Sequence, residues 1–246
     1  MSISKLCAFS VALSLALAYI VNPVLLAQEA VQTQKTDAAQ DEGFESLFDG
    51  ESLDGWSGAE GFWSIEDEAL TGRTTADNPT KGNTFLIWDG ELENFELRLK
   101  FRIIDGNSGV QFRSNDLGDH RVSGYQADID SKNTYMGILF EEKGRGILCK
   151  RTKQVTINEQ GEKSDTGEVC DDAEFLKAVK QEDWNDYVIV ANKNEISLTI
   201  NGITTAKVTD NQTEKAAKTG ILALQLHAGP PMTVQFKDIE LKVIED

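Results

Sequence analysis

Three short stretches of this sequence place polar side chains where a ligand could bind, provided that each stretch is a β-strand. Side chains alternate between the two faces of a strand, so residues two apart share a face. In each stretch one face is apolar, and the other carries amides and ionisable groups. These polar residues are Gln111 and Arg113 in SGVQFRS, Gln126, Asp128 and Asp130 in GYQADID, and Gln225 and His227 in ILALQLHA.

If the three strands are neighbours in one sheet, their polar faces merge into one concave surface. Amides and carboxylates can make paired hydrogen bonds to adjacent hydroxyl groups, which suits a sugar. The alternative is a face that simply meets water, since an antiparallel sheet often has one solvated side. Solvated faces are usually rich in Lys, Glu and Thr, as in ELRLKFR and EISLTI of this chain. The repeated glutamines differ from that pattern, and both interpretations stay open.

Other residues could extend or border this surface. The segment FEEKGRG carries Glu141 beside a glycine-bearing turn, and it is either part of the site or a charged hairpin tip. Asp130 lies at the end of its stretch, before SKN, and we expect it to be a turn residue. His120 is expected in an exposed loop. Trp88 could stack on a sugar, although a core position is favoured.

Strand patterns dominate the chain from Phe44 onward. Segments with β-branched and aromatic residues in alternation are separated by turns rich in Gly, Asn and Asp. This order predicts an all-β fold, an antiparallel sandwich or barrel, rather than alternating helices and strands. Asn201-Gly202, between ISLTI and ITTAKV, indicates a two-residue hairpin because both positions tolerate positive φ. The segment TKQVTINEQGEKSDTGEV is expected to be an exposed hairpin or a long loop.

One short helix is predicted, at DDAEFLKAVK. Asp171 or Asp172 can cap its start, acidic residues occupy its first turn and a lysine its last. We expect this helix to pack on the edge of the sandwich through Phe175, Leu176 and Val179.

The first residues have the order of a secretory signal, with Lys5, then an apolar run, then small residues near Ala27. We predict a signal peptide over 1–27, with an uncleaved anchor as the alternative. A flexible linker over 28–43 follows, since this stretch has almost nothing to bury. The remaining residues, 44–246, suit one domain with a substantial core. The expected location is periplasmic or extracellular.

Charge and cysteine content limit the partners. The formal net charge is −17, which repels nucleic-acid phosphates and anionic lipids. Nucleic acid is therefore not expected as a partner, and a membrane only if the N-terminal segment stays uncleaved. A neutral carbohydrate ligand meets no such repulsion. The protein is expected to be a monomer. Cys149 and Cys170 would remain after export, either as a disulfide or as two independent buried thiols.

Several common catalytic sites are not indicated by motif. The sequence has no GxSxG, no HExxH, no phosphate-binding glycine loop and no Cys–His arrangement at ligand spacing. No cofactor or metal is therefore expected. The EIDIE pattern typical of laminarinase-like retaining glycosidases is also missing, so a two-carboxylate hydrolase of that type is not supported.

Several segments between Phe44 and Glu240 occur in a characteristic order: FESLFDGESLDGW, FWSIEDEALTG, NSGVQFRS, GYQADI, WNDYVIVANKNEISLTINGI and GILALQLHAGPPMTVQFKDIEL. Together they resemble the 3-keto-disaccharide hydrolase domain family. The resemblance implies a concanavalin-like jelly-roll sandwich, and a secreted, often bacterial protein acting on sugars whose C3 hydroxyl has been oxidised to a ketone. The sequence departs from many members in GYQADID, where they read GyEvQ, so the carboxylate lies at a different position in the strand.

The chemistry that this resemblance implies fits the polar face. A C3 ketone acidifies the C2 proton, so the glycosidic bond can be cleaved by proton abstraction, loss of the C1 oxygen and addition of water. We predict Asp128 as the base and His227 as the acid or a second base, with Glu141 as the alternative acid. Arg113 would stabilise the enolate together with Gln126. The predicted substrate-binding residues are Gln111, Gln126, Gln225 and Asn107. The alternative function is a non-catalytic carbohydrate-binding module.

Overall fold

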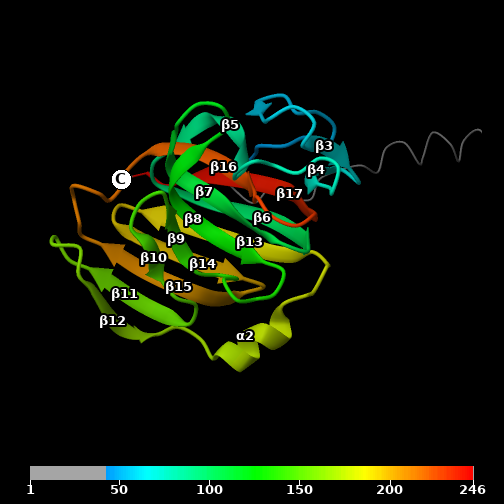
Figure 1. The fold of residues 1–246 in the computed structure, drawn as a ribbon. Helices are drawn as coiled ribbons and strands as arrows, with labels where there is room; N and C mark the ends of the chain where they lie inside the picture. The colour runs from blue at the N-terminus through cyan, green and yellow to red at the C-terminus, as the bar shows by residue number, and fades with distance from the viewer. Residues whose placement is uncertain (1–42, 246) are drawn as a thin grey trace, which may run out of the picture. The chain divides into compact units, whose positions relative to one another are not determined.

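The structure is a computed structural model that describes residues 43–245, and in this range the chain forms two β-sheets and one short helix (Figure 1). The predicted signal peptide, 1–27, and residues 28–42 of the predicted linker lie outside the described residues. The described range therefore corresponds to the predicted folded domain.

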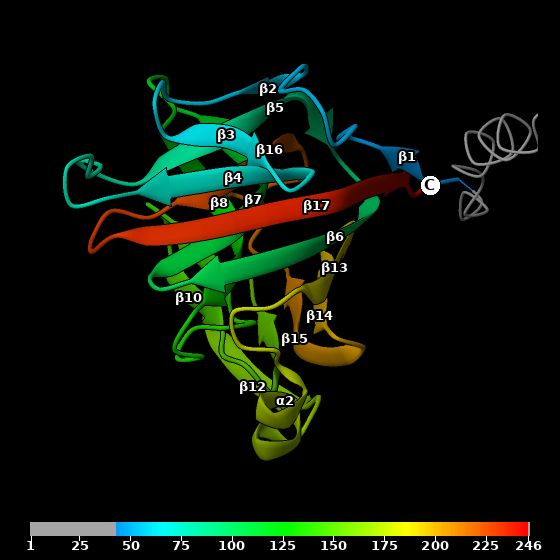
Figure 2. The same ribbon diagram turned by 90° about the vertical axis from the view of Figure 1, so that its right-hand side faces the viewer.

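The larger sheet contains ten strands, and Figure 2 shows its central strands side by side. Their order across the sheet is β12 (Lys163–Glu168), β11 (Lys153–Ile157), β15 (Ile203–Asp210), β14 (Glu195–Ile200), β13 (Asn185–Asn192), β6 (Phe95–Ile104), β17 (Met232–Val243), β4 (Ala69–Thr74) and β3 (Trp63–Glu66), with β1 (Glu45–Ser46) also paired to β17.

The smaller sheet contains seven strands. Their order is β10 (Gly146–Cys149), β9 (Leu139–Glu142), β8 (Val122–Asp130), β7 (Asn107–Asp116), β16 (Gly220–Leu226), β5 (Thr84–Leu92) and β2 (Trp56–Ser57). Within residues 43–245, β11 and β15 form the one parallel pair, and the other pairs are antiparallel. The fold is an all-β, antiparallel-rich sandwich of the jelly-roll kind, as predicted.

The core lies between the two sheets and follows from side-chain alternation. In β6, buried residues such as Leu97 and Phe101 alternate with partly exposed charged ones. In the smaller sheet, Val110 and Tyr125 belong to the same hydrophobic cluster. Burial of one face of each sheet provides most of the folding free energy, at roughly 25 cal/mol per Å² of apolar surface. The opposite face of the smaller sheet is not part of this core and remains available for a binding site.

The predicted turns and hairpins are present. Asn201 and Gly202 have φ values of 49° and 77° and join β14 to β15, which confirms the two-residue hairpin. The segment 152–169 forms the β11–β12 hairpin, and the parallel pairing of β11 with β15 joins it to the larger sheet. Both cysteines are free thiols, and Cys149 is buried.

The one helix in the described residues is α2 (Asp172–Ala178). The Asp171 side chain caps its start by accepting a hydrogen bond from the Glu174 amide at 2.9 Å, as the sequence suggested. Phe175 is buried, but Leu176 is 39% exposed and does not pack on the sandwich as expected. No helix among residues 43–245 is long and apolar enough to cross a membrane.

Candidate functional site

The three strands with polar faces, β8, β7 and β16, lie next to one another in the smaller sheet. Their register places Gln111 opposite Gln126, and Gly109 opposite Asp128. Gln225 directly follows Leu224, which is paired with Val110, so Gln225 is brought beside Gly109. The amides and the Asp128 carboxylate therefore form two adjacent rows across three strands, as a merged polar surface requires.

A cavity of about 370 Å³ lies over these rows, and we call it the cleft. Five of the residues proposed from the sequence line it, and two further polar residues, Asn83 and Glu142, complete its polar lining. The five residues are Asn107, Gln126, Asp128, Gln225 and His227. Glu142 lies on the same face as Phe140, whose partner across the strands is Gln126.

A chain of hydrogen bonds ends on Asp128. Ser114 Oγ donates to Gln111 Oε1 at 2.7 Å, and Gln111 Nε2 donates to Gln126 Oε1 at 2.8 Å. Gln126 Nε2 then donates to Asp128 Oδ1 at 2.6 Å and lies 3.4 Å from Gln225 Oε1. Each link fixes the orientation of the next amide. Among residues 43–245, no donor reaches Asp128 Oδ2, and Asp128 lines the cleft, so Oδ2 is the oxygen left for a ligand.

Gly109 makes this arrangement possible. A Cβ atom at residue 109 would lie 2.5 Å from Cγ of Gln126, which is closer than two non-bonded carbon atoms approach. Without a side chain, Gly109 lets Gln126 lie flat across β7 toward Asp128 and Gln225. The sequence shows this glycine but not its neighbour, because the neighbour depends on the register between β7 and β8.

Asp128 is a buried carboxylate without a cation. Its side chain is buried, and no Lys, Arg or His within the described range forms an ion pair with it. Burial raises its pKa to about 8, against the effect of the Gln126 hydrogen bond, and nearby Asp130 and Glu142 raise the pKa further. A carboxylate with a pKa near neutrality is suited to accept a proton from a substrate and to release it again.

His227 follows the last residue of β16 and points into the cleft from its rim. Its Nδ1 lies 2.5 Å from the carbonyl oxygen of Ala228. Because a carbonyl only accepts, Nδ1 carries the proton in the neutral ring, and Nε2 is the atom left for a substrate. Asn83 Oδ1 accepts a hydrogen bond from the Ala228 amide at 3.1 Å and so helps to position the histidine.

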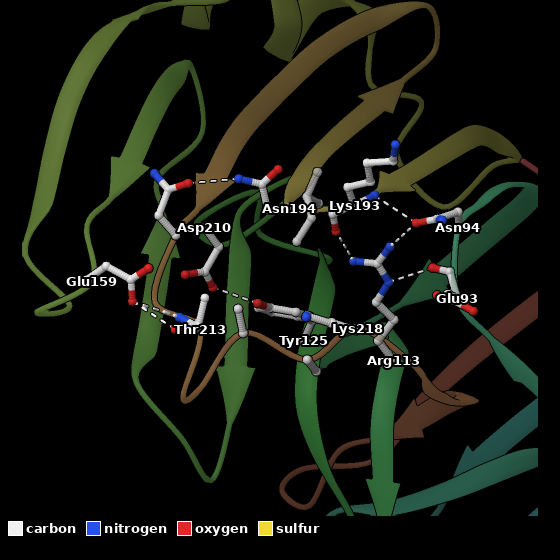
Figure 3. Close-up of a pocket in the computed structure, with 14 residues that line it drawn as sticks. Glu93, Asn94, Arg113, Tyr125, Glu159, Lys193, Asn194, Asp210, Thr213 and Lys218 are labelled. Carbon is white, nitrogen blue, oxygen red and sulfur yellow. Dashed lines mark hydrogen bonds between the residues drawn. The ribbon is translucent and has the colours of Figure 1, made fainter. Parts of the chain in front are cut away.

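Arg113 does not share the cleft, and its predicted place beside Gln111 is wrong. The register between β7 and β8 shifts between Phe112 and Asn115, and Arg113 has a φ of 45°. This bulge breaks the alternation on which the prediction depended. Figure 3 shows the guanidinium in a different cavity, of about 400 Å³, which it lines together with Tyr125.

The Arg113 guanidinium connects two turns there. It donates to the Glu93 carbonyl at 2.6 Å, the Lys193 carbonyl at 2.7 Å and the Asn94 side-chain oxygen at 3.1 Å. All three partners belong to the turns after β5 and β13. Arg113 therefore holds the fold together at this end and cannot stabilise an enolate formed beside Asp128.

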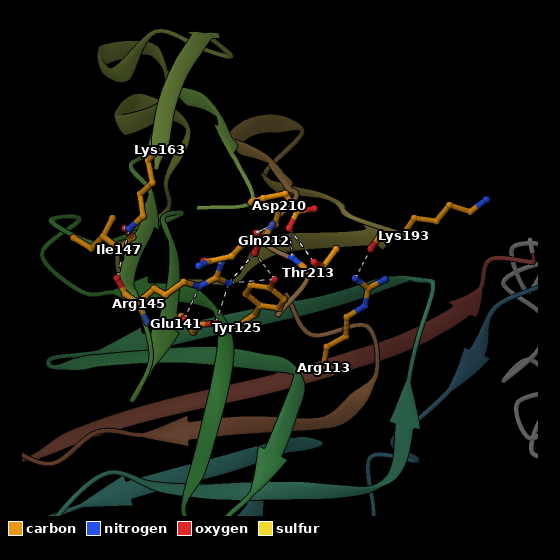
Figure 4. Close-up of polar contacts among 11 residues, drawn as sticks. Arg113, Tyr125, Glu141, Arg145, Ile147, Lys163, Lys193, Asp210, Gln212 and Thr213 are labelled. Atoms are coloured by element: carbon orange, nitrogen blue, oxygen red, sulfur yellow. Dashed lines mark hydrogen bonds and ion pairs between the residues drawn. The ribbon is translucent and has the colours of Figure 1, made fainter. Parts of the chain in front are cut away.

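Glu141 also lies away from the cleft, so its predicted role as alternative acid is not supported. It is opposite Tyr125 in the pairing of β8 with β9, on the inner face. Arg145 forms ion pairs of 2.8 Å with Glu141 and 2.7 Å with Asp210, and Tyr125 Oη donates to Asp210 at 2.6 Å (Figure 4). We call these four residues the Arg145 cluster. Glu142, one residue later, faces the cleft.

The other residues considered from the sequence lie at different depths in the fold. Gln111 is fully buried beneath the cleft and orients Gln126, so it supports the surface without lining it. Asp130 is predicted to be a turn residue, but it is the last residue of β8 and pairs with Asn107; its carboxylate accepts hydrogen bonds from amides of the loop that follows, and it does not line the cleft. His120 is half-buried in the β7–β8 loop. Trp88 packs against the core, as favoured.

The chain is a two-sheet sandwich with a galectin-like, jelly-roll fold and a polar cleft on its smaller sheet. The chain belongs to the 3-keto-alpha-glucoside-1,2-lyase-like domain family, which it matches over residues 43–242. This is the 3-keto-disaccharide hydrolase family that the sequence segments resemble. No curated protein matches the chain.

Solved structures share the fold at low sequence identity. A proposed glycosyl hydrolase from Parabacteroides distasonis is 21% identical with a TM-score of 0.54, over 82% of this chain and 99% of that one. A second from the same organism is 18% identical with a TM-score of 0.56, over 85% and 98%. The carbohydrate-binding module CBM66 from Bacillus subtilis is 16% identical with a TM-score of 0.51, over 76% and 95%.

Proposed function

We propose that this protein cleaves the glycosidic bond of 3-keto-glycosides by elimination, with Asp128 as the general base. The observation that carries this proposal is a buried, cation-free carboxylate at the floor of a polar cleft. Its Oδ1 is held by Gln126 and its Oδ2 is left for a substrate. The family to which the chain belongs supplies the class of substrate.

The elimination can be written with its atoms balanced. Asp128 takes the proton from C2, which the neighbouring C3 ketone has made acidic, and the electron pair forms an enolate. The enolate re-forms the ketone as the C1–O bond breaks, leaving a C1=C2 double bond. The departing oxygen takes up one proton. Water then adds across the double bond, so that the net reaction is hydrolysis.

The enolate oxygen needs a hydrogen-bond donor, and Gln225 is suited to supply it. Its side-chain oxygen is turned to Gln126 Nε2, so its NH₂ group is the part left to donate. Asn107 and Asn83 line the same cleft and offer further amide donors. Preorganised donors of this kind stabilise developing negative charge.

Two residues of the cleft are candidates to protonate the departing oxygen. Glu142 is half-buried and is a carboxyl group facing Asp128 across the cleft lining, whereas His227 presents Nε2. We assign the acid role to Glu142, with His227 as the second candidate for that role. A Glu142→Gln variant should then slow substrates with poor leaving groups most, and His227→Gln should slow all substrates to a similar degree.

The test of the function is direct. The purified protein is incubated with 3-keto-trehalose, 3-keto-lactose and the parent sugars, and released glucose and enone are measured. The wild type should act on the keto sugars alone. Asp128→Asn should lower turnover by about 10²- to 10⁴-fold, the usual contribution of a general base. Glu91→Gln, an exposed change on β5 of the same sheet, is the matched control. Unchanged turnover in Asp128→Asn would contradict the proposal.

The second candidate function is a carbohydrate-binding module. It is favoured by the shared fold with CBM66 and by the many amides of the cleft, which suffice to bind hydroxyls. In that case the keto sugars would bind without release of any product, and Asp128→Asn would alter affinity only.

Export is part of the proposal. The order of charge, apolar run and small residues in 1–27 supports it. Mature protein recovered from the periplasm or the medium should begin at Gln28, as N-terminal sequencing would show. Recovery of the uncleaved chain in the membrane fraction would favour the anchor instead.

A further inference from the structure

A second groove adjoins the cleft and shares one wall with it. Three side chains, Tyr135, Ile138 and Ile147, line both cavities. From these residues the groove, of about 410 Å³, continues over β10 toward Lys150 and Arg151. A ligand bound in the cleft therefore has a continuous path across these side chains.

Two of the three shared side chains are exposed and apolar. Tyr135 is 48% exposed and Ile147 is 38% exposed. Tyr135 is also the one aromatic residue among the exposed large hydrophobic residues in the described range. An apolar patch rimmed by polar groups typically marks a binding surface. An aromatic ring with a polar tip can contact the C–H face of a sugar and bond to its hydroxyls.

The backbone that carries Tyr135 is held in place by hydrogen bonds within the protein. Its backbone amide donates to Asp130 Oδ2 at 2.8 Å, and Asp130 is itself buried. From the other side, Arg151 Nη1 donates to the carbonyls of Asn133 and Met136 at 2.7 and 3.0 Å. The loop between β8 and β9 is thus fixed at both flanks of Tyr135. Such preorganisation lowers the entropy lost on binding.

We propose that Tyr135 and Ile147 form a leaving-group subsite. The oxidised ring of a 3-keto-disaccharide occupies the cleft beside Asp128, and the second, unoxidised pyranose lies over Tyr135 and Ile147 toward the groove. This inference rests on the proposed function and adds the residues that would hold the leaving group, so that a disaccharide should be a better substrate than a simple alkyl glycoside. The polar head of Tyr135 and the exposed Lys150 would meet hydroxyls of that second ring.

The experiment compares two substrates that differ only in the leaving group, 3-keto-lactose and methyl 3-keto-β-galactoside. Tyr135→Ala should lower kcat/KM for the disaccharide by about ten-fold, the scale of one aromatic contact, and for the methyl glycoside by less than about two-fold. Tyr135→Phe should retain most activity on both. The matched control is Leu117→Ala, because Leu117 is exposed to a similar extent, 45%, and lines neither cavity.

Binding separates failure of the subsite from failure of the proposed function. If the wild type cleaves neither substrate, the function is wrong, and calorimetric titration of the same two sugars tests the subsite alone. Tighter binding of the disaccharide to the wild type than to Tyr135→Ala supports it. The subsite is overturned if Tyr135→Ala binds and cleaves both sugars as the wild type does, or if it weakens the binding of both sugars equally. It is also overturned if the wild type binds neither sugar.

Discussion

Strands β8 and β9 bury carboxylates on both faces of the smaller sheet, and the partners of these carboxylates differ between the two faces. On the inner face, Arg145 forms ion pairs with both Glu141 and Asp210 within the Arg145 cluster. On the cleft face, Asp128 is equally buried but has an amide in place of a cation. A carboxylate paired with a cation keeps its charge and anchors the fold, whereas a buried one without a cation is driven toward its protonated form. The first arrangement favours stability, and the second favours proton transfer.

The largest effect that would test this contrast is the pH dependence of stability at Asp128. Burial raises its pKa from 3.8 to about 8, so with rising pH the unfolded chain loses the proton before the folded one does. The free energy of unfolding should therefore fall between about pH 4 and pH 8, by up to about 5 kcal/mol, and then level off.

In Asp128→Asn this decline should be absent, and the variant should be more stable than the wild type at pH 8. Urea denaturation of both proteins at several pH values between 4 and 9 would measure it. Parallel curves for the two proteins would show that Asp128 has an ordinary pKa and would remove the basis of the contrast.

The next effect concerns the Arg145 cluster. Arg145→Met would leave Glu141 and Asp210 buried without a cation, because their side chains are 11% and 1% exposed. We expect a loss of about 3 to 5 kcal/mol in the free energy of unfolding, the usual result of breaking a buried ion pair. Turnover per folded molecule should stay unchanged, since the cluster lies on the face opposite the cleft.

Arg121→Met is the matched control for Arg145→Met. Arg121 forms an ion pair with Asp119, but both side chains are more than half exposed, and such pairs contribute about 1 kcal/mol or less. If the two arginine variants were destabilised equally, burial would not be the property that distinguishes the Arg145 cluster.

A smaller effect is expected for Arg113, whose guanidinium binds neutral oxygens alone. Arg113→Met would leave the carbonyls of Glu93 and Lys193 without this donor, at a cost of about 2 kcal/mol. The rate constant kcat for a 3-keto-glycoside should not change. A fall in kcat without a fall in the denaturation midpoint would return Arg113 to the catalytic site.

The sequence predicts the fold and the centre of the cleft because both depend on period-two alternation. Leu224 and Gln225, like Ala127 and Asp128, lie in regular stretches of central strands, where alternation decides which face each side chain joins. For the same reason the core and the merged polar surface could be proposed without a structure.

Prediction failed where alternation is interrupted or depends on a partner. The bulge at Arg113 comes from its pairing with β8, and the choice between Glu141 and Glu142 depends on the register of the short strand β9. A one-residue slip reverses every face. Gly109 and Tyr135 gain their importance from neighbours across strands, which one sequence does not reveal.

The smallest effect tests a third arrangement, a buried polar group with no partner at all. The hydroxyl of Tyr187, in the core, has no hydrogen-bond partner among residues 43–245. Burial raises its pKa well above the usual range, and the charge on Asp128 adds to this. Tyr187→Phe removes an unsatisfied group, so stability should stay the same or rise by no more than about 1 kcal/mol.

Tyr125→Phe is the matched variant for Tyr187→Phe, because the Tyr125 hydroxyl donates to Asp210 at 2.6 Å within the Arg145 cluster. Losing a hydrogen bond to a charged group should lower the free energy of unfolding by about 2 kcal/mol. Thermal denaturation of the two variants measures the difference that one acceptor makes to two buried phenols. Equal losses would mean that Tyr187 has an acceptor in solution, and that the core beneath Asp128 is wetter than the packing of the two sheets indicates.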